Sequence, residues 1–310
     1  MMPDILLLGP KVQRDYAAPL AQELDARGIA ARLSPGLEPG AADYIVLQPD
    51  AAPADFTPYR RVKAVLSTWM GVESLVTNPT LTQPLARMVE PGMKRGMTEY
   101  VAAHVLRHHI GLDAHVHGLE GEWRQVLPPL APERPVTVLG LGELGRAAAQ
   151  ALAGLGFPVT GWSRSPRELR YLARSFSGQD GLHAALEGAP IVVVLLPLTP
   201  ATTNLLGAAE FARLAPGAVV INPARGPVID DAALIAALDS GQLGHATLDV
   251  FREEPLPPGH PFWHHPRVTV TPHVAAETRP AGAAAVIAEN IARVERGEPL
   301  LHRVDRSAGY

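Results

Sequence analysis

A glycine-rich hexapeptide between an apolar run and a helical pattern constrains this chain most. Residues 140–145 read Gly-Leu-Gly-Glu-Leu-Gly, the apolar run 136–139 precedes them, and residues 144–155 have the pattern of a helix. In this context the first glycine permits a tight turn, the second lets the backbone approach a pyrophosphate, and the third lets helix and strand pack closely. The free N–H groups at the start of the helix favour an anion there. The segment therefore predicts a dinucleotide-binding turn, and a glycine-rich turn without a ligand is the alternative.

Short apolar runs alternate with helical patterns, which predicts parallel sheets covered by helices on both faces. We expect strands at 5–8, 44–47, 62–66, 136–139, 159–162, 191–195, 218–221, 246–250 and 268–271, and helices at 19–27, 98–110, 144–155, 230–238 and 281–296. The fold class is α/β, with two Rossmann-like, doubly wound domains. We place a flavodoxin-like domain at residues 1–98 and 276–310. The dinucleotide-binding domain, residues 99–275, is inserted in it, because the last helix needs the first domain to cover it.

The composition removes several classes of protein. The 310 residues hold 27 basic and 31 acidic side chains, for a net charge of −4, so neither nucleic acid nor a membrane is expected as a partner. The chain has no cysteine, which excludes disulfides, thiolate metal sites and a cysteine nucleophile. The longest apolar run is far too short to cross a bilayer, and the N-terminus does not read as a signal peptide. We therefore expect a cytoplasmic protein.

The residues that end the second strand of the dinucleotide domain bear on the choice of cofactor. An acid is expected there when an adenosine 2′-hydroxyl is bound, but this chain has Ser163, Arg164 and Ser165. An arginine and hydroxyl groups suit a 2′-phosphate, so NADPH is favoured, with NADH still open. The alternative is that Arg164 is a solvated turn residue. Glu168, which follows Pro166, is expected to begin a helix.

Three charged or titratable residues follow three successive strands of the same domain. Arg225 lies in Asn-Pro-Ala-Arg-Gly, Glu254 in Arg-Glu-Glu-Pro, and His273 in Thr-Pro-His-Val. In open α/β sheets ligands bind beyond the carboxyl ends of the strands, where all three would meet. Each alone reads as an ordinary loop residue, but together they form a candidate catalytic set. Arginine is a permanent donor fork, and histidine titrates near neutrality and can move a proton.

These linked motifs, in this order, resemble the D-isomer-specific 2-hydroxyacid dehydrogenase family over essentially the whole chain, and within it the glyoxylate and hydroxypyruvate reductases. The resemblance rests on residues 139–145, 161–165, 196–200, 222–226, 248–258, 271–279 and 304–310. It implies that Arg225 binds the substrate carboxylate, that His273 gives a proton to the carbonyl oxygen, and that Glu254 orients the imidazole. Asp249 would hold the nicotinamide carboxamide. The residues implied at the cofactor are Leu141, Gly142, Glu143, Leu144, Gly145, Ser163, Arg164, Ser165, Leu195, Leu196, Pro197, Pro223, Ala224, Asp249 and Ala275.

The reaction implied by the resemblance is the NADPH-dependent reduction of a small 2-oxo acid, glyoxylate to glycolate and hydroxypyruvate to D-glycerate. The implied substrate-binding residues are Arg225, His273 and the loop Trp69, Met70 and Gly71, where the family has small residues in place of the first two. Bulk in that loop favours small substrates, although both side chains also read as core residues. The alternatives are another, NADH-linked member of the family, of the D-lactate or phosphoglycerate dehydrogenase type, and a nucleotide-sensing binding protein on the same fold.

Two further groups of residues receive plainer interpretations. His104 and His108 are spaced as on one helix face, but no carboxylate completes a zinc motif. We therefore expect no metal and place this group, His104, His108, His109, His115 and His117, on a helix surface or an interface. His260, His264 and His265 are expected to be solvated. Trp123 lies in the connector that forms a dimer arm in relatives, so a homodimer is expected.

Overall fold

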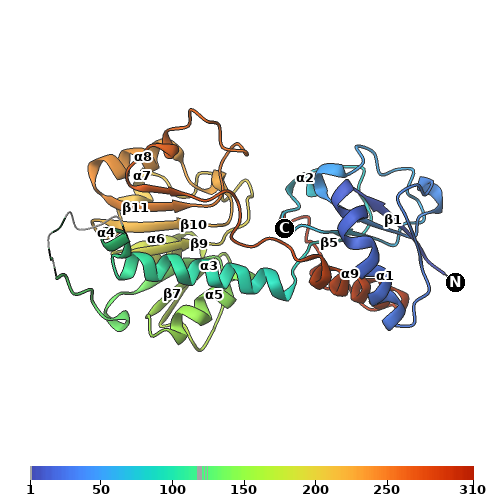
Figure 1. Ribbon diagram of the computed structural model, residues 1–310, viewed down its shortest axis with the longest axis horizontal. Helices are drawn as coiled ribbons and strands as arrows, with labels where there is room; N and C mark the ends of the chain where they lie inside the picture. The colour runs from blue at the N-terminus through green and yellow to red at the C-terminus, as the bar shows by residue number, and fades with distance from the viewer. Residues whose placement is uncertain (1, 117–120, 122, 124) are drawn as a thin grey trace. The chain divides into compact units, whose positions relative to one another are not determined.

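The chain divides into two compact units, shown in the computed structural model of Figure 1. The structure describes residues 2–116, 121, 123 and 125–310. Unit 1 is Met1–Met93 with Glu277–Tyr310, and unit 2 is Lys94–Ala276. The chain leaves unit 1 after residue 93 rather than 98 and returns to it after residue 276. That one unit binds substrate and the other the dinucleotide stays a prediction.

Unit 1 is built on a parallel sheet of five strands in the order β2-β1-β3-β4-β5. The strands are β1 Asp4–Leu8, β2 Arg32–Ser34, β3 Tyr44–Leu47, β4 Ala64–Ser67 and β5 Leu85–Ala86. Strand β3 is buried on both faces, which explains its unbroken apolar sequence. Helices α1 (Ala17–Ala26) and α9 (Pro280–Glu295) pack against one another (Figure 1). A π-helical turn, Val12–Tyr16, leads into α1, and the short helix α2 spans Glu73–Val76.

Unit 2 is built on a parallel sheet of seven strands in the order β12-β11-β10-β9-β6-β7-β8. The strands are β6 Val136–Leu139, β7 Val159–Ser163, β8 Arg174–Ser177, β9 Ile191–Val194, β10 Ala218–Asn222, β11 Leu243–Leu248 and β12 Val268–Val270. The helices are α3 Pro91–His109, α4 Leu112–Val116, α5 Glu143–Gly154, α6 Gly178–Leu186, α7 Ala208–Phe211 and α8 Asp231–Ser240. The chain order reverses between β6 and β9, and such a switch point opens a crevice for ligands.

The sheet of unit 2 separates two apolar clusters, because successive side chains of a strand point to opposite faces. Val192 and Val194 of β9 face a cluster to which α6, α7 and α8 contribute. Ile191 and Val193 face a cluster to which α3 and α5 contribute. The predicted parallel sheets with helices on both faces are therefore confirmed, and Figure 1 shows helices on either side of this sheet.

Helix α3 begins seven residues before the expected start at Thr98. The carboxylate of Glu90 accepts hydrogen bonds from the backbone N–H groups of Gly92 and Met93, both at 2.6 Å, and so caps the helix. Pro91 then occupies the first turn, where its missing N–H costs nothing. Thr98 is an interior residue, and its hydroxyl donates to the carbonyl of Lys94 at 2.8 Å. The expected helix boundary is wrong because the cap is the side chain of Glu90, and a proline and a glycine follow it in the first turn.

The segment after β7 also differs from the expectation. No helix begins at Glu168; the exposed residues 166–168 have no regular structure, and the edge strand β8 follows at Arg174. Strand β8 has half-exposed or exposed side chains, so it lacks the apolar signal of the central strands. Within the described residues, no helix has the length and apolar character that a membrane crossing requires.

Candidate active site

The three candidate catalytic residues follow three neighbouring strands. Strand β11 pairs in parallel with both β10 and β12, and Leu248 lies opposite Asn222 on one side and Val270 on the other. The loops that carry Arg225, Glu254 and His273 therefore leave the sheet along one edge. This is the edge of unit 2 that the sequence predicted for a ligand.

Glu254 and His273 form a hydrogen-bonded pair. Oxygen Oε2 of Glu254 lies 2.7 Å from Nδ1 of His273, and Oε1 accepts the backbone N–H of Phe251 at 2.8 Å. The hydrogen bond to Glu254 raises the pKa of His273 above its usual value, against the opposing effect of burial. Burial by itself would raise the pKa of Glu254, but the bonds from His273 and Phe251 hold that pKa below its usual value. The arrangement favours an imidazolium at His273, in which Nδ1 is the nitrogen that faces Glu254.

Arg225 sits on a turn that is shaped by Asn222, the last residue of β10. The Asn222 side chain is 1% exposed; it donates to the carbonyl of Arg225 at 3.0 Å and accepts the N–H of Ala224 at 3.1 Å. A Cβ on Gly226 would lie 2.1 Å from the carbonyl carbon of Phe251, so this turn contacts the Glu254 loop directly. The positive charge of Arg225 lowers the pKa of both His273 and Glu254. Sequence reasoning missed Asn222, whose only signal is a polar residue ending a buried strand.

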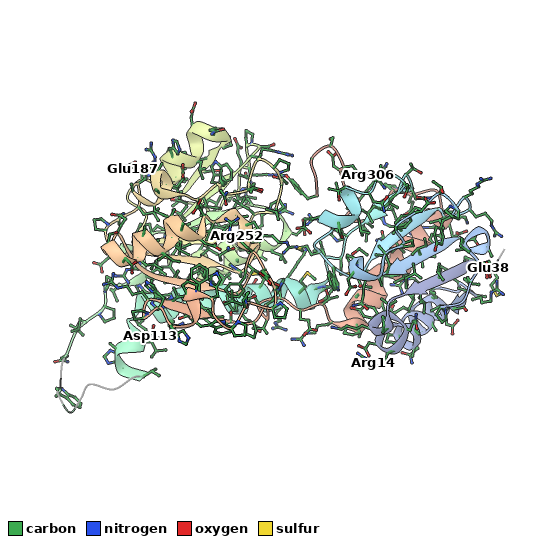
Figure 2. All side chains as sticks on the ribbon, turned by 90° about the horizontal axis from the view of Figure 1, so that it is seen from above. Arg14, Glu38, Asp113, Glu187, Arg252 and Arg306 are labelled. Atoms are coloured by element: carbon green, nitrogen blue, oxygen red, sulfur yellow. The ribbon has the colours of Figure 1, made fainter. Side chains whose placement is uncertain are left out.

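Arg252 is a second residue that sequence reasoning missed. It lies two residues before Glu254 and is labelled in Figure 2. Its guanidinium contacts the side chain of Asn204 and the carbonyl of Ile229, and lies 3.3 Å from the carboxylate of Asp231. These contacts tie the Glu254 loop to the connection between β10 and α8.

Asp249 was predicted to hold the nicotinamide, and the structure places it under the His273 loop. Its side chain is fully buried, and both carboxylate oxygens accept hydrogen bonds from residues 271–275. The Asp249 carbonyl accepts the N–H of His273 at 2.9 Å. A role of Asp249 toward the cofactor stays a prediction.

The glycine-rich loop meets the steric requirements of a dinucleotide turn. A Cβ on Gly140 would lie 2.4 Å from the carbonyl oxygen of Leu195, and one on Gly145 would lie 1.8 Å from that of Gly140. Gly142, the N-cap of α5, has no protein atom within 4 Å of the same position, and no side chain caps the helix. The open backbone and the helix dipole therefore suit a pyrophosphate. The Glu143 side chain pairs with Lys94 and Arg146.

The other predicted cofactor residues flank this loop. The N–H of Leu195 donates to the carbonyl of Leu139 at 2.7 Å, which brings residues 195–197 beside the start of the loop. Thr202, which sequence reasoning missed, donates to the carbonyl of Pro197 at 2.7 Å and accepts the N–H of Thr199 at 2.8 Å. Leu141, Leu196, Pro223, Ala224 and Ala275 are buried and Leu144 is half-buried; their contact with a cofactor stays a prediction.

The residues predicted to select the cofactor follow β7 directly. Arg164 and Ser165 are exposed, and the Ser163 hydroxyl donates to the carbonyl of Ser165 at 2.7 Å, which holds the turn. In unit 1, the predicted substrate loop follows β4. Trp69 is 40% exposed, whereas Met70 and Gly71 are half-buried, so Trp69 is no core residue. Contact of either group with a ligand stays a prediction.

The histidines of α3 were predicted at a helix surface or an interface; His104 and His108 are half-buried and His109 is buried, so none of these three lies on an open surface. His108 Nε2 lies 2.9 Å from the hydroxyl of Thr247, its ring lies 4.9 Å from that of His245, and His109 is buried. His104 packs on Tyr100 at 4.4 Å between ring centroids. Polar partners on β11, more than a hundred residues away, explain the position of His108. His115 is exposed, and His117 lies outside the described residues.

The histidines before β12 differ in the same way. His265 is 11% exposed at its side chain and lies 3.2 Å from Asp239, and His260 accepts the N–H of Phe262. Only His264 of the three is exposed as expected. No group of three His, Asp or Glu in the described parts of the chain is arranged to hold a metal ion.

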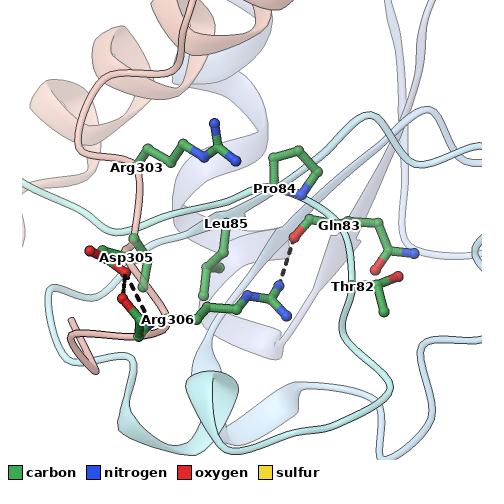
Figure 3. A pocket seen from close by; sticks show the side chains of 9 residues that line it. Thr82, Gln83, Pro84, Leu85, Arg303, Asp305 and Arg306 are labelled. Carbon is green, nitrogen blue, oxygen red and sulfur yellow. Dashed lines mark hydrogen bonds between the residues drawn. The ribbon is translucent and has the colours of Figure 1, made fainter.

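A cavity of about 500 Å³ lies in unit 1, and none of the predicted site residues is among those that line it. It is lined by Thr82, Gln83, Pro84, Leu85, Arg303, Val304, Asp305, Arg306 and Ser307 (Figure 3). Arg306 closes it on one side by donating to the carbonyl of Gln83 at 2.7 Å.

Known proteins resemble this chain over most or all of its length. Residues 101–275 match the family profile described as D-isomer specific 2-hydroxyacid dehydrogenase, NAD binding domain. A glyoxylate/hydroxypyruvate reductase A of Serratia proteamaculans is 42% identical over 81% of this chain and 82% of its own length. A reductase of the same name from Klebsiella pneumoniae is 40% identical over 87% and 88%.

Solved structures agree with the sequence relatives. A D-isomer specific 2-hydroxyacid dehydrogenase of Xanthobacter autotrophicus, in complex with NADPH and MES, has a TM-score of 0.91 and 40% identity, with both chains covered completely. An NADPH-dependent glyoxylate/hydroxypyruvate reductase of Sinorhizobium meliloti, in complex with NADP and sulfate, has a TM-score of 0.85 and 35% identity, again over both whole chains. The chain is an NAD(P)-dependent dehydrogenase that belongs to the D-isomer-specific 2-hydroxyacid dehydrogenase family.

Proposed function

We propose that this enzyme reduces glyoxylate to glycolate and hydroxypyruvate to D-glycerate with NADPH. The observation that carries the proposal is the His273–Glu254 pair, in which the carboxylate favours the protonated imidazole. When bound, NADPH supplies the hydride for the carbonyl carbon. His273 delivers a proton from Nε2 to the carbonyl oxygen, and Glu254 stabilises the charged imidazole before that transfer. Arg225 binds the substrate carboxylate through its planar donor fork.

The relatives support the cofactor and the substrates. Three solved structures of similar fold hold NADPH or NADP, and several of the curated relatives are reductases of glyoxylate and hydroxypyruvate. In this chain the exposed Arg164, between two serines at the end of β7, suits a 2′-phosphate, and no acid lies at that strand end to favour NADH. We also assign dinucleotide binding to unit 2 and the substrate loop Trp69–Gly71 to unit 1.

The decisive experiment measures oxidation of NADPH and NADH in parallel, by nicotinamide absorbance, against glyoxylate, hydroxypyruvate and pyruvate. We expect the first two acids with NADPH to give the highest kcat/KM. His273→Asn should lower kcat at least about a hundredfold, because general acid catalysis contributes that much or more. His264→Asn is the matched control, since His264 is an exposed histidine of the same unit. Equal loss in both variants, or turnover of pyruvate alone, would contradict the proposal.

A binding experiment tests the cofactor assignment separately from turnover. Arg164→Ala should weaken NADPH in calorimetric titration and leave NADH unchanged, since only NADPH carries the 2′-phosphate. Arg60→Ala, an exposed arginine of unit 1, is the control. If Arg164→Ala weakened the binding of NADPH and NADH equally, Arg164 would not account for a preference for NADPH. Tight nucleotide binding with no turnover of any oxo acid would favour a nucleotide-sensing protein instead.

We propose further that the enzyme is a homodimer. The described residues between the end of α3 and residue 130 include several exposed large apolar side chains, with Trp123 94% and Leu127 83% exposed. The others are Ile110, Leu112, Val116, Val126 and Leu130. Such a surface marks a protein interface, and a second copy of the chain is the simplest partner. Sedimentation should give twice the chain mass, and Leu127→Ser with Trp123→Ser should shift it toward the monomer; a wild-type monomer would refute this.

A further inference from the structure

His273 has a backbone conformation that histidine rarely adopts. Its φ is +54°, in the left-handed region that costs free energy for a residue with a Cβ. Such a conformation persists only where the surroundings hold it. The imidazole that meets Glu254 at 2.7 Å is therefore placed by contacts beyond that pair.

Asp249 holds the loop around His273 through hydrogen bonds to its backbone. The side-chain oxygens of Asp249 accept the N–H groups of Val274 at 3.0 Å and Ala275 at 2.9 Å, and its carbonyl accepts that of His273 at 2.9 Å. One buried residue thus binds the backbone of three successive residues. Asp249 is itself fixed to the neighbouring strand, because its N–H donates to the carbonyl of Asn222 at 3.1 Å.

Two hydroxyl groups continue this network into α3. The Thr271 hydroxyl lies 2.6 Å from Oδ1 of Asp249, and the Tyr100 hydroxyl lies 2.7 Å from that of Thr271. A carboxylate can only accept hydrogen bonds, so the single hydroxyl proton of Thr271 is donated to Asp249. Tyr100 must then be the donor to Thr271, which gives the chain one direction, Tyr100 to Thr271 to Asp249. Burial raises the pKa of Tyr100, so the donor keeps its proton throughout the working pH range.

We propose that Tyr100 and Thr271 are positioning residues for the proton donor: their hydroxyl chain orients Asp249, which holds residues 273–275 so that His273 faces Glu254. The assignment of proton transfer to His273 rests on the proposed function. The positioning itself concerns only residues of unit 2 and can be measured without substrate. Neither hydroxyl contacts the pair directly, so both act through Asp249.

The test compares Thr271→Val, which removes the hydroxyl at nearly constant shape, with Thr271→Ser, which keeps it. The titration midpoint of His273 is followed by NMR of the histidine ring nitrogens in the full chain. We expect the midpoint to fall in Thr271→Val, because the hydrogen bond to Glu254 weakens, and to return toward the wild-type value in Thr271→Ser. Tyr100→Phe should move it in the same direction by less. Tyr44→Phe is the control, since it removes a tyrosyl hydrogen bond to Glu295 in unit 1.

Turnover gives the second readout. In Thr271→Val we expect kcat with glyoxylate and NADPH to fall about tenfold, equivalent to about 1.4 kcal/mol, with NADPH affinity unchanged. The falling limb of the pH profile should move to lower pH. A wild-type midpoint and wild-type kcat in both Thr271→Val and Tyr100→Phe would overturn the positioning role, even if both variants melt at lower temperature. If wild-type enzyme turns over no oxo acid, the proposed function fails, while the NMR midpoints still decide the positioning.

Discussion

Acid stability should depend on a half-buried histidine of α3, His108. It faces His104 and Arg107 on its own helix, His245 on β11, and Asp113 on α4. Burial, with the nearby positive groups, lowers the pKa of His108 to about 3, from 6.5 in the unfolded chain. The same causes lower the pKa of His245 to about 4. Protonation therefore favours the unfolded state.

The sign and size of the effect follow from these values. Above about pH 6.5 His108 is neutral in both states and contributes no pH dependence. As the pH falls from about 6.5 toward 3, only the unfolded chain takes up the proton, and stability is lost by about 1.4 kcal/mol per pH unit. At pH 5 the loss from His108 is therefore about 2 kcal/mol. Below about pH 3 the native state binds the proton too, and the loss levels off.

The variant His108→Gln removes the titration and keeps a side chain that can hydrogen-bond to Thr247. Urea unfolding at pH 7 and pH 5 gives the free energy of unfolding of wild type and variant. We expect the variant to lose about 2 kcal/mol less than wild type between the two pH values. His115→Gln, at an exposed histidine in α4, should lose as much as wild type. Equal losses in wild type and His108→Gln would refute the reasoning.

Three further predictions concern the glycine loop, a helix cap and the catalytic pair. Gly145→Ala should lower the melting temperature by several degrees, because the added Cβ would lie 1.8 Å from a backbone oxygen. Gly142→Ala should leave the melting temperature unchanged and weaken NADP binding in calorimetry, because no protein atom lies near its Cβ position. A destabilised Gly142→Ala and an unchanged Gly145→Ala would contradict the assignment of this loop to the dinucleotide. Asp230→Ala should cost about 1 kcal/mol in urea unfolding, because the Asp230 side chain caps α8, and Asp230→Ser should recover most of it. Glu254→Gln should lower the pKa of His273, which moves the falling limb of the pH–rate profile of reduction to lower pH. A falling limb at the wild-type pH would show that Glu254 does not control the protonation of the proton donor.

The central elements of unit 2 could be predicted because their signals are local. Strand β9 is an unbroken run of apolar residues, and the turn at residues 140–145 combines glycines with a following helix. Strand β8, Arg174–Ser177, gave no such signal, because it lies at the sheet edge with its side chains partly in solvent. The early start of α3 depends on Glu90, a carboxylate whose capping role is visible only from its contacts.

In the candidate site, too, some residues have a signal in the sequence and others do not. Arg225, Glu254 and His273 could be named as candidates from sequence, because their chemistry and their places after strands both point to a reaction, and their roles stay a prediction. Asn222 and Thr202 could not, since they act on backbone groups of their own loops. The buried histidines could not either, because histidine suits both surface and interior, and the partners of His108 lie on a distant strand.

The three strand ends support their side chains by different means, which predicts different consequences of change. Asn222 and Asp249 are almost fully buried and bind the backbone of the loops, so their loss removes hydrogen bonds from the folded state as well as from the site. His273 is about half exposed at its side chain, and its loss leaves the loop bonds intact. A change at His273 should therefore lower activity and leave stability almost unchanged. A change at Asn222 or Asp249 should lower both activity and stability. We therefore expect the candidate catalytic residue His273 to be replaceable at little cost to the fold, in contrast to the buried residues Asn222 and Asp249 that hold the loops.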